Sequence, residues 1–275
     1  MTTWISLHAF HHGDLDELLL HGVRPLVTRL RQEELIDGFF FLRYWDGGPH
    51  LRIRLSPVTA AAAPDVRGIA LGRLRDHLTA HPSRDLPDLG GYAASAARLA
   101  AGEGMTDYLR APLPNNTVHE IPYRPETDRY GEGASLAAAE RHFTESSRIA
   151  LGLIGAGSTP DQRCGAALSA LLLAWHGRRV PPPAGRADDE QRYIRVRAGL
   201  RGLAERAARI GEGTAPPGEN GALTAWWRTV GTLPDPGVRD LCAHLFCNRL
   251  GIPPGRERSL RYLAARALTS ETEHR

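Results

Sequence analysis

The sequence contains no lysine, and all 34 of its basic residues are arginines. This excludes chemistry that needs a lysine amine: Schiff-base catalysis, attachment of pyridoxal phosphate, and the phosphate-binding loop that ends in Gly-Lys-Ser/Thr. Arginine is nearly balanced by 31 acidic residues, which leaves a formal net charge of only +3. Nucleic-acid-binding proteins concentrate far more positive charge on one surface, so direct binding of RNA or DNA is not expected.

Cysteine is also scarce, since Cys164, Cys242 and Cys247 are the only three in the chain. A disulfide framework needs more, so a reducing compartment is expected. Cys242, His244 and Cys247 resemble a metal triplet, but on a helix residues two and five positions apart point in different directions, so we predict no metal site. The sequence lacks an apolar run long enough for a membrane span and a secretion signal at its N-terminus, which predicts a cytoplasmic protein.

The chain has 275 residues, of which 42% are hydrophobic, so it can bury a sizeable core. Alternating apolar residues predict strands at 4–10 and 117–123, and a β-hairpin over 39–55 whose turn is Asp46-Gly47-Gly48-Pro49. Apolar residues at helical spacing predict helices over 15–30, 66–80, 92–109, 135–154, 160–176, 188–210, 223–230, 238–250 and 258–268. We therefore expect an α+β fold, with a small, mostly antiparallel sheet from the N-terminal third packed against a helix-rich C-terminal half, forming one domain over residues 1–275.

The second strand of the hairpin, His50-Leu51-Arg52-Ile53-Arg54-Leu55, alternates strictly. Its leucines and isoleucine face the core, which places His50, Arg52 and Arg54 in a row on the opposite face. Such a row is neutralised either by acidic residues of the same protein or water, or by a bound anion, because arginine presents a planar fork that holds a carboxylate through two hydrogen bonds.

Two further clusters carry polar residues. The first runs from Tyr123 through Glu126 and Arg129 to Gly131 and is predicted to be a loop, where Glu126 pairs with Arg129 as a local contact or both residues are functional. The second, His244 to Arg249, lies on an apolar helix, where the histidine is either a hydrogen-bonded core residue or an acid-base catalyst.

Together these clusters resemble the C-terminal domain of lantibiotic dehydratases, which also occurs as a separate thiopeptide-type bacteriocin biosynthesis protein. The resemblance rests on Trp4 to His8, on Phe40 to Arg54 with its Gly-Gly-Pro-His turn, on Tyr123 to Gly131 followed by Ala139, Glu140 and Phe143, and on His244 to Leu250. These motifs occur in the family's order from near the first residue to about residue 250.

The resemblance implies a lyase. Full-length family enzymes use glutamyl-tRNA to esterify serine and threonine side chains of a precursor peptide, and this domain then eliminates glutamate to leave dehydroalanine or dehydrobutyrine. It implies catalytic roles for Arg52, Arg54, Arg129 and His244. The residues expected to contact the substrate are His50, Arg43, Tyr44, Tyr130, Glu126, Asn248 and Arg249. No cofactor or metal is implied. The partners would be the precursor peptide and a separate tRNA-dependent glutamylating enzyme, and homodimer formation is left open.

Such an elimination removes the proton at the peptide Cα, stabilises the resulting enolate and lets a carboxylate leave. Arginine forks suit the carboxylates, and a histidine can transfer the proton. The chain departs from the family pattern at Glu132, where a glycine is usual, and at Phe246, where a second histidine is common. Two alternatives therefore stay open: a formal [4+2] cycloaddition that forms the pyridine ring of thiopeptides, and a non-catalytic peptide-binding subunit.

Overall fold

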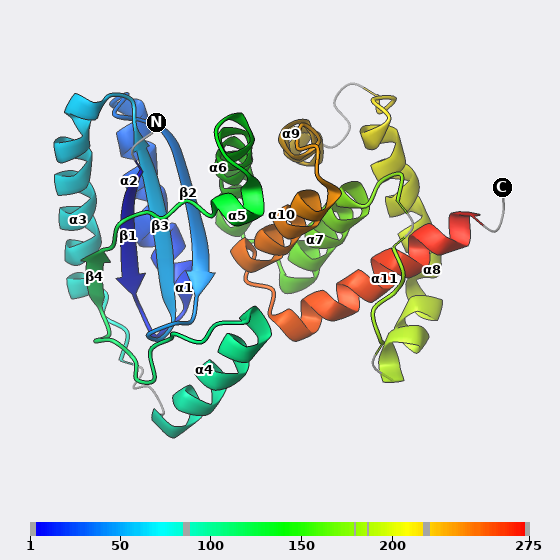
Figure 1. Cartoon of the computed structure of the whole chain (residues 1–275), viewed down its shortest axis with the longest axis horizontal. Helices are drawn as coiled ribbons and strands as arrows, with labels where there is room; N and C mark the ends of the chain where they lie inside the picture. Colours follow the sequence, from blue (N-terminus) through cyan, green and yellow to red (C-terminus); the bar gives the residue numbers. More distant parts are fainter. Residues whose placement is uncertain (1–3, 85–88, 179, 186, 217–220, 273–275) are drawn as a thin grey trace. The chain divides into compact units, whose positions relative to one another are not determined.

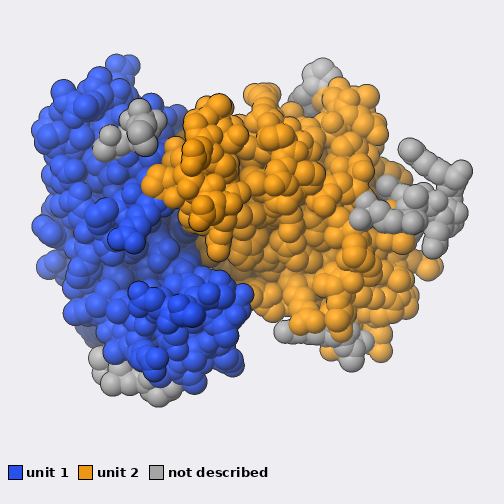
Figure 2. Space-filling view, in the orientation of Figure 1, with its two compact units in different colours: residues 1–124 blue, residues 125–275 orange. Residues whose placement is uncertain are grey.

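The computed structural model of the protein describes residues 4–84, 89–178, 180–185, 187–216 and 221–272. These residues form two compact units, residues 1–124 (unit 1) and 125–275 (unit 2), which are coloured separately in Figure 2. The fold is α+β, as predicted, with its antiparallel sheet in the N-terminal region. That the two units make up one domain stays a prediction.

Unit 1 is built on a four-stranded sheet (Figure 1) whose strands are β1 (Ile5–Phe10), β2 (Ile36–Tyr44), β3 (His50–Pro57) and β4 (Thr117–Glu120). The strand order is β2-β3-β1-β4, and all three pairings are antiparallel. The predicted hairpin is confirmed and begins three residues earlier than expected. Its turn uses Gly47 and Gly48 at φ values of 83° and 102°, which favour glycine.

One face of this sheet is apolar and belongs to the core of unit 1. It consists of Ile5, Leu7, Ala9, Phe39, Phe41, Leu51, Ile53, Leu55 and Val118, all of them buried. Helices α2 (Arg24–Gln32) and α3 (Ala63–Ala80) contact the strands and contribute buried side chains such as Leu30 and Leu74. A single turn, α1 (Leu15–Glu17), and a π-helical turn over Leu18–Val23 lead into α2, and Asp14 caps α1 by accepting from the backbone N–H of Asp16 at 2.8 Å.

Two boundaries and one short helix in the middle of the chain differ from the sequence-based prediction. Helix α4 (Leu89–Glu103) ends six residues early, because Gly104 adopts φ 67° and the N–H of Met105 closes the helix on the carbonyl of Ala100. Strand β4 ends at Glu120 instead of Tyr123, and Pro122 follows with no N–H to continue the ladder. The segment expected to be a loop contains a one-turn helix, α5 (Thr127–Tyr130).

Unit 2 is helical throughout its described elements, as expected. Besides α5, its helices are α6 (Ala134–Gly155), α7 (Pro160–Ala174), α8 (Ala187–Gly211), α9 (Gly221–Val230), α10 (Pro236–Arg249) and α11 (Pro254–Thr272). Helix α7 contacts α8, α9, α10 and α11 (Figure 1), and it starts with a capping box between Thr159 and Gln162. Within the described part of the chain, none of the helices has both the length and the apolar character needed to cross a lipid bilayer.

Candidate functional site

The second face of the unit 1 sheet is polar, and we call it the polar face. Because directly opposed residues of antiparallel strands share a face, the register places Arg52 beside His8 and Arg54 beside Ser6. The residues that make this face polar are Ser6, His8, Tyr44, His50, Arg52, Arg54, Ser56 and His119. The predicted row of His50, Arg52 and Arg54 is therefore confirmed, and the first strand adds a second row beside it.

Arg52 and Arg54 are each held by a ring on this face. The guanidinium carbon of Arg52 lies 3.3 Å from the ring centroid of Tyr44, whose hydroxyl donates to the carboxylate of Glu103 at 2.8 Å. Nη2 of Arg54 lies 3.3 Å from Nε2 of His8, which must accept because a guanidinium only donates. Two guanidinium groups are thus held on the same face of the sheet.

His8 and His50 on the polar face are neutral near pH 7. Burial lowers the pKa of His8 to about 2, with Arg54 as the next cause, and burial lowers the pKa of His50 to about 4. Nδ1 of His50 donates to the carbonyl of Gly48 at 2.9 Å, and the two imidazole rings stack with their centroids 5.0 Å apart. These rings offer hydrogen-bond acceptors next to two cations.

The buried polar atoms of this face include Oγ of Ser6, Oγ of Ser56 and Nε2 of His50, which have no hydrogen-bond partner among the described residues. A buried polar atom without a partner costs free energy, and in most proteins such atoms are satisfied. Ser6 lies opposite Arg54 on the neighbouring strand, and on β3 His50 and Ser56 lie two residues from Arg52 and Arg54 respectively. This arrangement is typical of a surface that binds a polar ligand.

Arg43, a predicted substrate contact, lies on the other face of the sheet, opposite Leu51. Its guanidinium pairs with the carboxylate of Asp16 in α1. Arg43 therefore does not join Arg52 and Arg54, although Tyr44, the next residue, does. A direct contact between Arg43 and substrate stays a prediction that the geometry does not favour.

The predicted residues of the Tyr123–Gly131 segment lie on and before α5. Nη1 of Arg129 donates to the carboxylate of Glu126 at 3.0 Å, and both side chains are more than half exposed, so the local contact exists and is weak. Tyr130 is buried and packs edge-on against Phe143, with 5.0 Å between ring centroids. Burial, followed by the charge of Glu126, raises the pKa of Tyr130, which keeps the phenol protonated.

His244 lies on α10 and is half exposed. Its Nδ1 donates to Oε2 of Glu257 at 2.8 Å, and Glu257 is a buried residue in the first turn of α11. Because Nδ1 carries the donated proton, the neutral ring presents Nε2 as a proton acceptor. This is the geometry of a histidine oriented by a carboxylate, and His244 is not a core residue.

Arg249, at the C-terminal end of the same helix, is fully buried. Its Nη1 donates to Oγ of Ser146 at 3.3 Å, and its guanidinium carbon lies 5.5 Å from the ring of Phe143. Burial lowers the pKa of Arg249 to about 10, so the side chain is still charged at neutral pH. Its described contacts are with the interior of unit 2, while the neighbouring Asn248 is partly exposed. The substrate contacts expected of both residues stay predictions.

The cysteines of α10 are interior residues, since Cys242 and Cys247 are both buried. Burial raises the pKa of the Cys242 thiol to about 12, which leaves it protonated and unreactive. Within the described ranges, no group of three His, Cys, Asp or Glu side chains is placed to hold a metal ion.

A family model described as "Lantibiotic biosynthesis dehydratase C-term" matches residues 4–268. The chain belongs to this family. A search of the curated proteins finds no significant match.

Solved structures share the fold of this lantibiotic dehydratase C-terminal chain. The pyridine synthase TbtD from thiomuracin biosynthesis is 22% identical, with a TM-score of 0.78 over 99% of this chain and 100% of TbtD. TsrL is 18% identical, with a TM-score of 0.62 over 99% of this chain and 96% of TsrL. The tRNA-dependent lantibiotic dehydratase MibB from Microbispora sp. 107891 is 21% identical, with a TM-score of 0.62 over 99% of this chain but only 28% of MibB.

Three polar residues of this family member, Ser6, His8 and Glu257, were not identified from the sequence as candidate site residues. Ser6 and His8 alternate with Ile5, Leu7 and Ala9, so the period of two in the first strand could have placed them beside the arginines. Glu257 carried no such signal. It is thirteen residues beyond His244, and only the turn between α10 and α11 brings the two side chains together.

Proposed function

We propose that the protein is a glutamate-eliminating lyase that acts on glutamylated serine and threonine residues of a ribosomally made precursor peptide. Family membership supports a role in peptide modification. The observation that carries the finer proposal is the pair of guanidinium groups of Arg52 and Arg54, held on one strand by Tyr44 and His8. A glutamyl ester supplies a matching anion, the side-chain carboxylate of glutamate.

In the proposed reaction a base removes the Cα proton of the esterified residue, the Cβ–O bond breaks, and glutamate leaves with the bonding electron pair as a carboxylate. Arg52 and Arg54 bind the glutamyl group and stabilise the negative charge that develops on the leaving oxygen. A guanidinium has five N–H donors, so it can serve partners within the protein and a bound carboxylate together. The neutral acceptors His8 and His50 do not compete for the cations as an acidic side chain would.

The proposal gives the proton transfer to His244. Its Nδ1 is bound to Glu257, so Nε2 is the nitrogen that takes or returns the proton. The carboxylate behind the ring stabilises the imidazolium that forms when the proton arrives. Arg129 has the role of a further carboxylate ligand, for which it must exchange its exposed contact with Glu126.

A separate tRNA-dependent enzyme would supply the glutamylated peptide. The proposal is supported by the likeness to MibB, a tRNA-dependent dehydratase of which this chain matches 28%. We place this step in the cytoplasm, where aminoacyl-tRNA is made.

A second candidate is a formal [4+2] cycloaddition that forms a pyridine ring from two dehydroalanines. The observation that favours it is the likeness to the pyridine synthase TbtD, which extends over the whole of both chains. A catalytically silent subunit that only binds the peptide is the remaining alternative.

Mass spectrometry of the protein with a glutamylated peptide separates these functions. Loss of glutamic acid supports the lyase, and an unchanged but bound peptide supports the silent subunit. Conversion of a dehydrated peptide to a macrocycle, without action on the glutamylated one, supports the cyclase and overturns our proposal. Arg52→Ala should abolish the loss of glutamic acid, whereas Arg67→Ala, which removes an exposed arginine paired with Glu120 in the same unit, is the matched control.

A further inference from the structure

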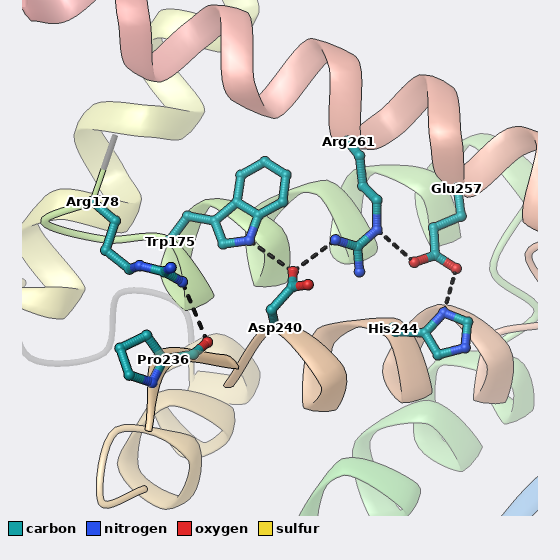
Figure 3. Close-up of polar contacts among 7 residues, drawn as sticks. All are labelled: Trp175, Arg178, Pro236, Asp240, His244, Glu257 and Arg261. Atoms are coloured by element: carbon teal, nitrogen blue, oxygen red, sulfur yellow. Dashed lines mark hydrogen bonds and ion pairs between the residues drawn. The ribbon is translucent and has the colours of Figure 1, made fainter. Parts of the chain in front are cut away.

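A chain of polar contacts connects the interior of unit 2 to His244 (Figure 3). It runs from Trp175 through Asp240, Arg261 and Glu257 to the imidazole ring. Asp240 and His244 are four residues apart on α10, and Glu257 and Arg261 are four residues apart on α11. Residues four apart share one face of a helix. Asp240 can therefore contact Arg261 while His244, one turn further along α10, contacts Glu257.

Each contact in this chain joins two defined atoms. Nε1 of Trp175 donates to Oδ1 of Asp240 at 2.7 Å, and the same oxygen accepts from Nη1 of Arg261 at 2.7 Å. Nε of Arg261 donates to Oε1 of Glu257 at 2.8 Å, which leaves Oε2 for Nδ1 of His244 at 2.8 Å. Both oxygens of Glu257 are therefore engaged, and its carboxylate cannot rotate without breaking a charge-assisted bond.

The chain is anchored at one end and open at the other. Trp175 follows α7 directly and is only 3% exposed, while the side chain of His244 is 46% exposed. The guanidinium carbon of Arg261 also lies 5.6 Å from the centroid of the Trp175 ring. In Figure 3 the second ring nitrogen of His244 lies on the side of the ring away from Glu257. The buried Trp175 thus holds the buried end of a set of contacts that orients the accessible imidazole of His244.

We propose that Asp240 and Arg261 are positioning residues, which hold the carboxylate of Glu257 and through it keep His244 in the tautomer protonated at Nδ1. This inference rests on the proposed acid-base role of His244 only for its effect on activity. The state of the ring itself follows from the contacts, because a carboxylate in a fixed position accepts from one nitrogen only. Without Arg261, Glu257 gains rotational freedom and the preference between the two neutral tautomers is lost.

Nitrogen NMR of the full-length protein with ¹⁵N-labelled histidine tests the inference without any substrate. The His244 signals are assigned by their loss in His244→Gln, and the spectra are recorded at a pH where the ring is neutral. The wild-type ring should be protonated at Nδ1. Asp240→Asn and Arg261→Met should give a mixture of both tautomers. Arg266→Gln, which removes another cation of α11, one that is paired with Glu190, should leave His244 as in the wild type.

Activity provides a second readout. With a glutamylated peptide, Asp240→Asn should lower kcat on the order of tenfold with KM unchanged, as expected for an outer group that orients a catalytic one. If Arg261→Met fails to fold, Trp175→Phe makes the same test, because it removes the indole N–H that binds Asp240 and keeps an aromatic ring in its place. An unchanged tautomer in the folded variants overturns the inference. A changed tautomer without an effect on kcat supports the inference and instead contradicts the acid-base role of His244.

Discussion

The two faces of the unit 1 sheet are made by the same strands but differ in almost every property. On the apolar face, Phe41 and Ile53 are paired across β2 and β3 and are completely buried. On the polar face, Arg52 and Arg54 flank Ile53 along β3 and share the face with two neutral histidines, His8 and His50.

Because the two faces differ in this way, one strand contributes to stability through its apolar face and to the proposed function through its polar face. Burial of apolar side chains stabilises the fold, whereas buried cations and hydroxyl groups without partners cost free energy that must be offset elsewhere. In β3, the apolar side chains of one face hold the backbone in place, and the cations and hydroxyl group of the other face are available to bind substrate. Substitutions on the two faces should therefore change different measured quantities.

The largest effect is expected from the apolar face. Phe41→Ala removes a fully buried aromatic ring and leaves a cavity, so it should lower the free energy of unfolding by about 3 to 5 kcal/mol. Urea denaturation followed by circular dichroism measures this loss. The protein that remains folded should retain its activity towards a glutamylated peptide, and an inactive but stable Phe41→Ala protein would contradict the division between the faces.

The reverse pattern is expected for Arg52→Ala. Its activity should fall by a factor of about 100 or more, because a charge-stabilising donor is lost from the transition state. Its stability should fall by only about 1 kcal/mol, through the lost stacking on Tyr44. Arg52→Lys keeps the charge without the planar fork, and full activity in that variant would show that bidentate binding is not required.

The histidines of the polar face predict that acid destabilises the protein. In the unfolded chain His8 and His50 take up a proton near their ordinary pKa of 6.5, whereas in the folded protein their pKa values are about 2 and about 4. Below pH 6.5 the unfolded state thus binds more protons, and the free energy of unfolding should fall by up to about 1.4 kcal/mol per pH unit for each histidine.

Urea midpoints measured from pH 7 to pH 5 give this slope. In the double variant His8→Gln and His50→Asn, whose amides replace the hydrogen-bonding nitrogens, the slope should flatten but not vanish. The remainder is expected because burial also lowers the pKa of His142 in unit 2, to about 3. An unchanged slope would mean that the two imidazoles are not buried as neutral groups.

The smallest effect is expected at Ser56. Its buried hydroxyl has no partner among the described residues, so Ser56→Ala should raise the free energy of unfolding by about 1 kcal/mol while lowering activity. Thermal denaturation and the rate of glutamate loss together measure the two changes. Thr106→Ala, which removes a hydroxyl from an exposed loop position of the same unit, should change neither stability nor activity. If Ser56→Ala also changed neither quantity, the Ser56 hydroxyl would not be part of the site.

Much of unit 1 could be predicted because its strands have a clear period. The alternation of His50 to Leu55 places the arginines on one face without knowledge of any partner strand. The preceding strand has no such contrast, since Phe39, Phe40, Phe41 and Leu42 are all apolar. For this reason the sequence did not show which of Arg43 and Tyr44 shares a face with Arg52.

The contacts of unit 2 could not be predicted in the same way. The apolar stripes predicted its helices within a few residues, but the partner of His244 depends on how α10 and α11 lie against α7. Thirteen residues and a turn separate His244 from Glu257, and no local pattern encodes their distance. The pair of Glu126 and Arg129 was one of two alternatives predicted from the sequence, because residues three positions apart can contact each other within a turn.

The position of β1 in the sheet has a consequence for how unit 1 is assembled. This strand comes first in the chain but lies between β3 and β4, so residues 5–10 find their neighbours only after residues 50–57 and 117–120 have been made. Long sequence separations between paired strands slow folding, and the hairpin of β2 and β3 is the natural early nucleus. Removal of residues 5–10 would leave β3 and β4 with open edges, which invites pairing between chains and aggregation.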